Sequence, residues 1–299
     1  KMSRALSNPR LHGRTMVVPM LHRFPLRTNM RSFSLSPYPV VTVDVTGTMI
    51  SYKGSVGEWY SSAARKAGLP CADYEAIDNG FKLAYKETCK KYPCFGANMM
   101  TGKEWWRICV QRSFEHAGYS VGEDQAEALF QRIWSLFGSP KIYEVCPDIK
   151  PFLTWAKRRG IVTGIISNSD ERYADGVLPM LQLTEQIDFF VFSKKEGVEK
   201  PDPLIFEAAF RRAQTFYGLE HLERGHVLHI GNSYDADFLG AKNFGFDAIL
   251  MDRWEDLDLE IMSAEGVPVA YDFLEVVEYI TKKSTYAKDC CSPLAHLNS

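Results

Sequence analysis

Hydrophobic positions along the chain follow two patterns: short continuous runs and longer runs with helical spacing. The short runs are rich in Val, Ile and Phe, which is typical of strands buried on both faces. They lie at residues 40–45, 161–166, 189–192, 226–230 and 248–251. Helical spacing predicts helices at residues 148–159, 171–181, 202–214, 238–244 and 272–282. Strands that alternate with helices predict an α/β fold with a Rossmann-like, doubly wound parallel sheet.

The alternation is interrupted directly after the first strand. Four helical stretches follow one another there, separated by Gly and Pro. They lie at residues 57–66, 73–91, 102–117 and 123–137. This pattern predicts a helical insertion of roughly ninety residues that forms a small bundle. The chain then divides into an arm at residues 1–38, a core at 39–54 and 139–282 in which 49–54 is a short loop, the helical insertion at 55–138, and a disordered tail at 283–299.

The first part of the chain is basic. Residues 1–33 contain seven basic residues and neither Asp nor Glu. An Arg- and Ser-rich segment of this kind, without a long apolar run, is typical of a mitochondrial transit peptide. Cleavage is predicted after Phe33, in Arg31-Ser32-Phe33-Ser34, and the mature protein is then expected in the mitochondrial matrix. The alternative is a retained basic arm that docks on RNA or on an acidic partner.

The rest of the chain is acidic. Of 35 basic and 37 acidic residues, removal of the seven in the arm leaves 28 against 37. Such a body argues against a nucleic-acid surface unless residues 1–33 are retained. The chain has 45% hydrophobic residues, as globular proteins do, and no apolar run long enough to span a membrane. Its seven cysteines follow no zinc or disulfide spacing, so we expect reduced thiols in an intracellular compartment.

Four segments at strand ends or helix starts carry the candidate chemistry. Asp44 follows the first strand and precedes Gly47, and a carboxylate there needs a partner or a function because a bare buried charge is costly. The segments are Asp44-Val45-Thr46-Gly47-Thr48, Ser167-Asn168, Lys200-Pro201-Asp202-Pro203 and Gly231 to Asp237. In a parallel sheet they converge on the edge where α/β proteins bind ligands. Their carboxylates, hydroxyls and ammonium suit a phosphate group and a hard divalent cation.

In this order, the four segments resemble the motifs of the haloacid dehalogenase superfamily, over about residues 39–282. The helical insertion resembles the C1 cap of that family. Within it, Thr101 to Trp106 and the preceding Tyr92-Pro93 resemble the group named hydrolase domain-containing protein 3. The resemblance implies that Asp44 is a nucleophile that forms an aspartyl-phosphate.

The resemblance also implies roles for the other motif residues. Lys200 would pair with Asp44 and with the phosphoryl charge. Ser167 and Asn168 would bind the phosphoryl oxygens, and Thr48 would shape the turn beside the substrate. The implied Mg²⁺ ligands are Asp44, the Thr46 carbonyl, Asp237 and Asn232.

Two positions depart from the pattern of that family. Thr46 stands where the family usually has a second Asp, the general acid and base, and a hydroxyl of this kind cannot supply the proton. A positioned acid or base contributes about 10²–10⁴-fold to the rate. Asn232 stands where the family usually has Asp, so the implied metal site loses one negative charge.

Three functions follow as alternatives. The first is a slow Mg²⁺-dependent phosphatase of a small phosphorylated metabolite. The second is a catalytically impaired pseudoenzyme that serves as a structural or assembly subunit of a mitochondrial complex. The third is a metal-free dehalogenase, because haloacid dehalogenases also lack the second Asp and can carry Asn in the fourth motif.

Other polar and aromatic residues receive structural expectations. We expect Trp105 and Trp106 in the core of the helical insertion. The two histidines of residues 226–230 are expected to be core or edge residues without a catalytic role. Tyr52 and Lys53 are candidates for facing the substrate.

Overall fold

The computed structural model describes residues 36–69 and 73–290. The predicted cleavage site after Phe33 and residues 291–299 of the predicted tail lie outside the described residues.

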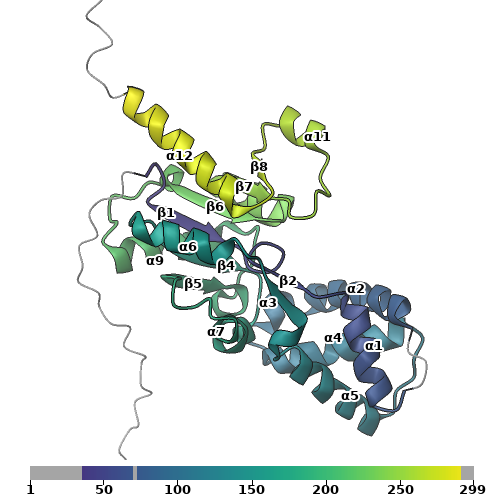
Figure 1. The fold of residues 1–299 in the computed structure, drawn as a ribbon. Coiled ribbons are helices and arrows are strands. Elements are labelled where there is room, and N and C mark those ends of the chain that lie inside the picture. Colours follow the sequence, from purple (N-terminus) through teal and green to yellow (C-terminus); the bar gives the residue numbers. More distant parts are fainter. Residues whose placement is uncertain (1–35, 70–72, 291–299) are drawn as a thin grey trace, which may run out of the picture. The chain divides into compact units, whose positions relative to one another are not determined.

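The core is built on a six-stranded sheet in which every pair of neighbours is parallel (Figure 1). The strand order β5-β4-β1-β6-β7-β8 puts β1 inside the sheet, with the later strands added outward in both directions. The strands are β1 (Val40–Val43), β4 (Val162–Ser167), β5 (Phe189–Phe192), β6 (Val227–Gly231), β7 (Asp247–Met251) and β8 (Val269–Ala270). The predicted doubly wound parallel sheet is confirmed, and only the two-residue β8 gave no signal in the sequence.

Helices cover both faces of the sheet because successive strand residues point to opposite sides. Val41 of β1 packs in a cluster with helices α6 (Ile149–Arg158) and α12 (Phe273–Cys290). Val40 packs in the opposite cluster with α9 (Pro203–Tyr217). Each strand is therefore apolar on both sides, which explains the continuous apolar runs in the sequence.

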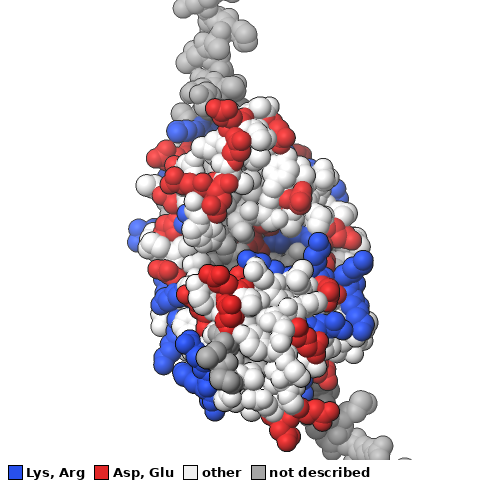
Figure 2. Space-filling model, turned by 90° about the vertical axis from the view of Figure 1, so that its right-hand side faces the viewer, with Lys and Arg blue, Asp and Glu red and all other residues white. Residues whose placement is uncertain are grey.

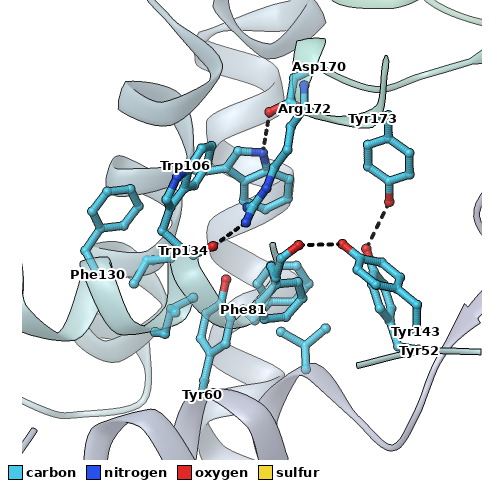
Figure 3. A pocket seen from close by; sticks show the side chains of 14 residues that line it. Tyr52, Tyr60, Phe81, Trp106, Phe130, Trp134, Tyr143, Asp170, Arg172 and Tyr173 are labelled. Atoms are coloured by element: carbon cyan, nitrogen blue, oxygen red, sulfur yellow. Dashed lines mark hydrogen bonds between the residues drawn. The ribbon is translucent and has the colours of Figure 1, made fainter. Parts of the chain in front are cut away.

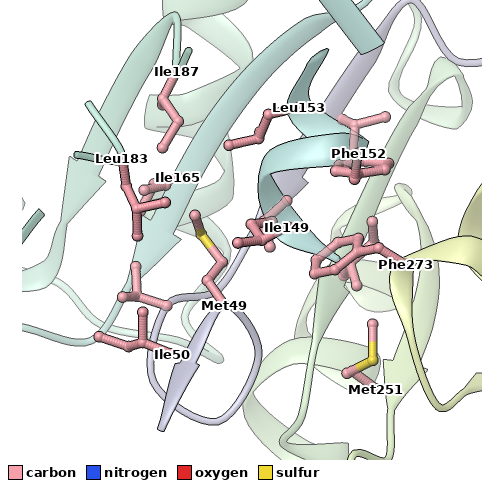
Figure 4. Packing of buried hydrophobic residues seen from close by; sticks show 14 of the residues in the cluster. Met49, Ile50, Ile149, Phe152, Leu153, Ile165, Leu183, Ile187, Met251 and Phe273 are labelled. Carbon is pink, nitrogen blue, oxygen red and sulfur yellow. The ribbon is translucent and has the colours of Figure 1, made fainter. Parts of the chain in front are cut away.

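Figure 4 shows the first of these clusters, where α6 and α12 meet over the sheet. Phe152 of α6 and Phe273 of α12 lie with ring centroids 4.5 Å apart. Met49 and Ile50, which follow the Asp44 turn, are fully buried in the same cluster. Apolar packing of Met49 and Ile50 thus holds the turn that carries Asp44 in place.

The remaining helices of the core are short. They are η1 (Pro140–Ile142), η2 (Tyr173–Val177), α7 (Leu178–Met180), α8 (Ser193–Glu196), η3 (Arg224–His226), η4 (Tyr234–Leu239), α10 (Gly240–Phe244) and α11 (Leu259–Ala264). Of these, η2 and η4 are π-helical turns: η2 begins shortly after the segment Ser167-Asn168, and η4 begins within the segment Gly231 to Asp237. Turns of this kind are frequent at functional sites.

In the described residues, five helical segments form the helical cap, which lies between β2 and β3 in the chain (Figure 1). They are α1 (Val56–Lys66), α2 (Tyr74–Lys91), α3 (Pro93–Gly96), α4 (Gly102–His116) and α5 (Glu123–Leu136). Ser55 with Glu58, and Thr101 with Glu104, form capping boxes that fix where α1 and α4 begin. Gly80 lets α2 approach α4 closely, since a Cβ there would lie 2.3 Å from the Ser113 carbonyl oxygen.

The predicted loop at 49–54 is wrong. Residues Ile50–Tyr52 form strand β2, which pairs antiparallel with β3 (Tyr143–Val145). A three-residue strand is too short to show a period, and its partner lies on the far side of the cap in sequence. This ribbon carries the chain into the cap and back out of it.

The boundaries of the predicted arm and tail also need correction. Tyr38 is not in an arm: it is buried, stacks on Tyr279 and donates a hydrogen bond to the Asp247 carboxylate. Helix α12 does not end at residue 282 but continues to Cys290. Lys283 continues it because its ammonium lies 3.0 Å from Asp247 Oδ2 and 5.5 Å from the Tyr38 ring centroid.

Charge is mixed on the face shown in Figure 2, where acidic and basic side chains lie among one another. Within residues 36–69 and 73–290, none of the helices combines the length and the apolar character needed to cross a membrane.

Candidate active site

Asp44 lies at the carboxyl edge of the sheet, immediately after β1. Its backbone N–H donates to the Ile230 carbonyl at 2.8 Å, so the chain still follows β6 at this point. The turn then depends on Gly47, which has φ of 91°. A Cβ at this position would also lie 2.5 Å from the Asn232 side chain. The glycine therefore sets the turn and lets the first and fourth segments approach each other.

Lys200 joins two of the predicted site residues. Its ammonium Nζ lies 2.6 Å from Asp44 Oδ1 and 2.6 Å from Asp237 Oδ1, and it donates to the Ile166 carbonyl at 2.8 Å. The Lys200 side chain is only 2% exposed. The expected contact of Lys200 with Asp44 is therefore present, and the contact with Asp237 is additional. Two carboxylates and one ammonium leave a net charge of −1 in this buried group.

Burial and the ammonium act in opposite directions on the two carboxyl groups. Burial raises the pKa of Asp44 to about 6, although Lys200 opposes the change. Burial also disfavours the Asp237 charge, but Lys200 and His229 hold the pKa of Asp237 well below its usual range. The two carboxylates keep the pKa of Lys200 raised despite its burial. Lys200 is thus a fixed positive charge beside the candidate nucleophile.

His229, to which we gave no catalytic role, lies against this group. Its Nε2 is 3.1 Å from Asp237 Oδ1 and its Nδ1 is 2.9 Å from Thr42 Oγ1. Burial lowers the pKa of His229, so the ring is neutral. A neutral ring donates one proton, and the Asp237 carboxylate can only accept, so Nε2 carries the hydrogen and Thr42 donates to Nδ1. His229 is therefore a positioning residue for Asp237, and the signal for it was a polar side chain inside an apolar strand.

Ser167 and Asn168 follow β4 at the same edge. Ser167 is the buried last residue of that strand. The Asn168 side chain holds the backbone of Lys200, because Oδ1 accepts from the Lys200 N–H at 2.7 Å and Nδ2 donates to its carbonyl at 2.9 Å. Asn168 therefore fixes where the Lys200 side chain starts. The roles of Ser167 and Asn168 toward a phosphoryl group stay predictions.

Thr46 and Thr48 face different surroundings. Thr46 Oγ1 is 2.8 Å from the hydroxyl of Tyr173 in η2. Thr48 is fully buried and its hydroxyl lies 3.4 Å from Asn232 Oδ1. The Thr48 carbonyl accepts from Arg253 Nε and Nη2 at 3.0 and 2.9 Å. Arg253, which the sequence analysis did not single out, thereby anchors the turn after Asp44.

The oxygen atoms at this edge suit the predicted Mg²⁺ in type. The carboxylates of Asp44 and Asp237, the Thr46 carbonyl and the Asn232 amide oxygen are all hard donors. Within the described ranges, however, no group of three His, Cys, Asp or Glu side chains is placed to hold a metal ion. The donor set therefore fits Mg²⁺ with only two carboxylates, and Lys200 lies between them. Both features predict weak binding.

An aromatic cavity adjoins this edge, between the core and the cap (Figure 3). Nine of its fourteen lining residues are aromatic. Tyr173 connects it to the site, since its hydroxyl lies 2.8 Å from Thr46 Oγ1 and 3.2 Å from the Tyr52 hydroxyl. Tyr52 thus lies in the cavity, whereas Lys53 is exposed.

The two adjacent tryptophans of α4 have different surroundings. Trp105 is fully buried in the cap, as expected. Trp106 instead lines the cavity, and its Nε1–H donates to Asp170 Oδ2 at 2.9 Å. The indole N–H needs an acceptor when it is buried, and that acceptor comes from the core.

Asp170 gives a prediction for stability. Burial raises its pKa from 3.8 to about 6, with Glu171 adding to the shift and the Trp106 hydrogen bond opposing it. A raised pKa means that the folded chain binds the proton more tightly, so this stabilising contribution is complete below about pH 4 and is lost as the pH rises through about 6. We expect Asp170→Asn to be more stable than the wild type at about pH 7, by at most about 3 kcal/mol for a shift of about two units. Denaturant unfolding should show this advantage shrinking toward pH 4, and an equal advantage at both pH values would contradict it.

The fold and site together define an α/β protein with two carboxylates and a lysine at the carboxyl edge of a parallel sheet, beside a helical cap. The chain belongs to the haloacid dehalogenase-like hydrolase family, whose model matches residues 38–245. It is 32% identical over 241 residues to haloacid dehalogenase-like hydrolase domain-containing protein 3 of Bos taurus, covering 80% of this chain and 87% of that protein.

Two solved structures share the fold. YfnB from Bacillus subtilis, described as a HAD-hydrolase bound to magnesium, has a TM-score of 0.60 at 16% identity and covers 82% of this chain and 99% of its own. A 2-haloacid dehalogenase from Pseudomonas syringae has a TM-score of 0.56 at 19% identity and covers 82% and 99%. At these identities the likeness shows the fold alone.

Proposed function

We propose that this chain is a slow Mg²⁺-dependent phosphatase of a small phosphorylated metabolite, and that it acts through an aspartyl-phosphate in the mitochondrial matrix. The observation that carries the proposal is the ammonium of Lys200 at 2.6 Å from Asp44 Oδ1. It places a positive charge directly beside a carboxylate at the carboxyl edge of the sheet. The basic arm supports the location.

In the first step an Asp44 oxygen attacks phosphorus, and the bond from phosphorus to the leaving oxygen breaks with its electron pair. Lys200 stays in place and offsets the charge on the phosphoryl group, which is the largest kind of contribution to such reactions. Ser167, at the end of β4, offers a hydroxyl to the phosphoryl oxygens. Water then attacks phosphorus, the bond to Asp44 breaks, and phosphate and a proton leave.

Asp237 and His229 position the ammonium. Asp237 Oδ1 accepts from Lys200, and its Oδ2 accepts from the Ser233 N–H at 2.9 Å. His229 Nε2 donates to the same oxygen, Oδ1, that accepts from Lys200. Mg²⁺, when bound by Asp44, Asp237, the Thr46 carbonyl and Asn232, supplies further positive charge to the phosphoryl oxygens.

Slow turnover follows from Thr46. Its hydroxyl is shared with Tyr173 and neither protonates the leaving oxygen nor activates water as a carboxyl group would. The magnesium-bound YfnB supports the metal, since its fold is the same.

Asn232→Asp is expected to tighten Mg²⁺ binding, because it returns a negative charge to an exposed position beside Gly47. Calorimetric titration of the full chain with Mg²⁺ should show about tenfold or more tighter binding, which corresponds to about 1.4 kcal/mol. Phosphate release from a panel of small phosphate esters should require Mg²⁺ in both proteins. The matched control is Asp235→Asn, also exposed in the fourth segment, which should leave the affinity unchanged. Equal affinity in Asn232→Asp and wild type would remove Asn232 from the metal site.

A second function has a specific observation in its favour. Lys200 lies between the two carboxylates, and Thr46 and Asn232 both lack the usual charge, which together suit a catalytically impaired protein. Such a protein would act as a structural or assembly subunit of a mitochondrial complex. The panel distinguishes the two functions, because an assembly subunit releases no phosphate from any ester. Adding a 2-haloacid to the panel tests the dehalogenase alternative.

A further inference from the structure

The aromatic cavity has a chemical character that the phosphatase proposal does not use. Phe81, Trp106 and Trp134 come from three helices of the cap, whereas Tyr52 and Tyr173 come from the ribbon and the core (Figure 3). Residues so distant in sequence build one apolar space whose only lining charges are Asp170 and Arg172. A cavity of this kind suits a flat apolar ring, because aromatic rings gain from stacked and edge-to-face contacts beyond the area that they bury.

The cavity also lies where a leaving group would be. Tyr173 lines it and contacts Thr46, two residues after the candidate nucleophile. A phosphate ester with its phosphorus beside Asp44 and the rest of the molecule in the cavity therefore has its leaving oxygen near the Thr46–Tyr173 pair. The hydroxyls of Thr46 and Tyr173 are joined by a hydrogen bond of 2.8 Å.

These hydroxyls are poor acids. Phenols and alcohols both keep their protons near neutral pH, and the Thr46 alcohol is the weaker acid of the two. The Asp170 carboxyl lines the cavity too, but both its oxygens accept hydrogen bonds, one from Trp106 and one from the Arg172 N–H. The leaving oxygen must then depart as an anion. A phenol, with a pKa near 10, does so far more readily than an alcohol.

We propose that the substrate is a phosphate monoester of a small phenol, with its ring in the aromatic cavity between Trp134 and Tyr173 and its phosphorus at Asp44. The inference rests on the proposed phosphatase function. Asp44 attacks phosphorus, the phosphorus–oxygen bond to the ring breaks, and the phenolate takes the electron pair and later a proton from solvent. Two separate features, the ring-lined cavity and the missing acid at Thr46, select the same class of ester.

The ring needs room that Arg172 now takes up. The cavity measures about 50 Å³, which holds about three to five water molecules. The Arg172 guanidinium lies 3.9 Å from the Trp134 ring centroid and donates to the Trp134 carbonyl (Figure 3). A bound ring replaces the guanidinium against the Trp134 face, so Trp134 is the residue that tests the proposal.

The test compares four esters on the full chain: phenyl, benzyl, trifluoroethyl and propyl phosphate, with Mg²⁺ present. They separate the ring from the ease with which the oxygen leaves. We expect kcat/KM for phenyl phosphate to exceed that for propyl phosphate by about 100-fold or more. It should also exceed the values for benzyl phosphate, which has the ring but a poor leaving oxygen, and for trifluoroethyl phosphate, which has a better leaving oxygen but no ring. Trp134→Leu should lower kcat/KM for phenyl phosphate about tenfold and leave propyl phosphate unchanged. The matched control is Trp155→Leu, which removes a half-buried tryptophan stacked on Arg159 in the core, away from the cavity.

A binding measurement separates this inference from the proposed function. Asp44→Asn is titrated with phenylphosphonate and with propylphosphonate, which cannot be hydrolysed. We expect phenylphosphonate to bind more tightly than propylphosphonate. This preference should be lost when Trp134→Leu is added and kept when Trp155→Leu is added, and it would support the ring site even if no ester is hydrolysed. The absence of hydrolysis for every ester would refute the phosphatase function alone. Equal hydrolysis of phenyl and propyl esters, or loss of activity toward both in Trp134→Leu, would overturn the inference and leave the phosphatase standing.

Discussion

Asp44→Asn is expected to have no measurable phosphatase activity on any ester that the wild type hydrolyses. An amide is a poor nucleophile, so the aspartyl-phosphate cannot form, and kcat should fall by roughly 10⁴-fold or more, as removal of a covalent nucleophile does elsewhere. The fold should survive, because Lys200 keeps Asp237 Oδ1 at 2.6 Å and the Ile166 carbonyl at 2.8 Å as partners. The measurement is phosphate release by the full chain, with circular dichroism and thermal unfolding to verify the fold.

Two comparisons make the Asp44 result specific. Asp235→Asn removes a carboxylate from the exposed start of η4 and should keep wild-type activity. Asp44→Asn should also be inactive when combined with Thr46→Asp. Residual phosphate release above about one hundredth of the wild-type rate, in a correctly folded variant, would show that another group is the nucleophile.

Thr46→Asp is expected to raise kcat by about 10²–10⁴-fold. The new carboxyl group can protonate the leaving oxygen and then activate water for hydrolysis of the aspartyl-phosphate. The Tyr173 hydroxyl lies 2.8 Å from Thr46 Oγ1. It can therefore donate a hydrogen bond to the introduced carboxylate and orient it. Benefit should be largest for esters of alcohols, whose oxygen most needs the proton, and smallest for esters of phenols.

The control for Thr46→Asp is Thr46→Asn, which has the same shape and no proton to transfer. It should turn over no faster than the wild type. If Thr46→Asp and Thr46→Asn have the same rate, the residue at this position does not limit catalysis.

The combination of Thr46→Asp with Asn232→Asp decides between the two proposed functions. It restores both carboxylates that the family pattern usually has. A doubly changed protein that binds no Mg²⁺ and hydrolyses nothing would favour the pseudoenzyme. Proteins that copurify with the chain would then identify the complex.

The sequence by itself determined the class of fold and the position of the site. Apolar runs such as 161–166 are buried on both faces, and burial on both faces specifies a central parallel strand regardless of details elsewhere. Parallel strands share one carboxyl edge, so the residues that follow β1, β4 and β6 had to meet there. These are consequences of local periodicity and strand direction, which a single sequence displays.

Only the tertiary structure decided how the side chains at that edge pair. Lys200 contacts Asp44, 156 positions away in sequence, and also Asp237, and no local pattern gives a distance between residues so far apart. His229 appeared as a polar residue in an apolar strand, and its role emerged only because β1 and β6 place Thr42 beside it in register.

The β2–β3 ribbon and the aromatic cavity were also determined only by the tertiary structure. Strand β2 exists because β3, on the other side of the cap, completes its hydrogen bonds, and three residues alone have no detectable period. The cavity arises because aromatic residues of the cap, the ribbon and η2 leave a space where they meet. Helical spacing predicted helices in the cap, but the volume between them depends on how whole elements pack. That packing follows from the complete set of contacts rather than from any one segment.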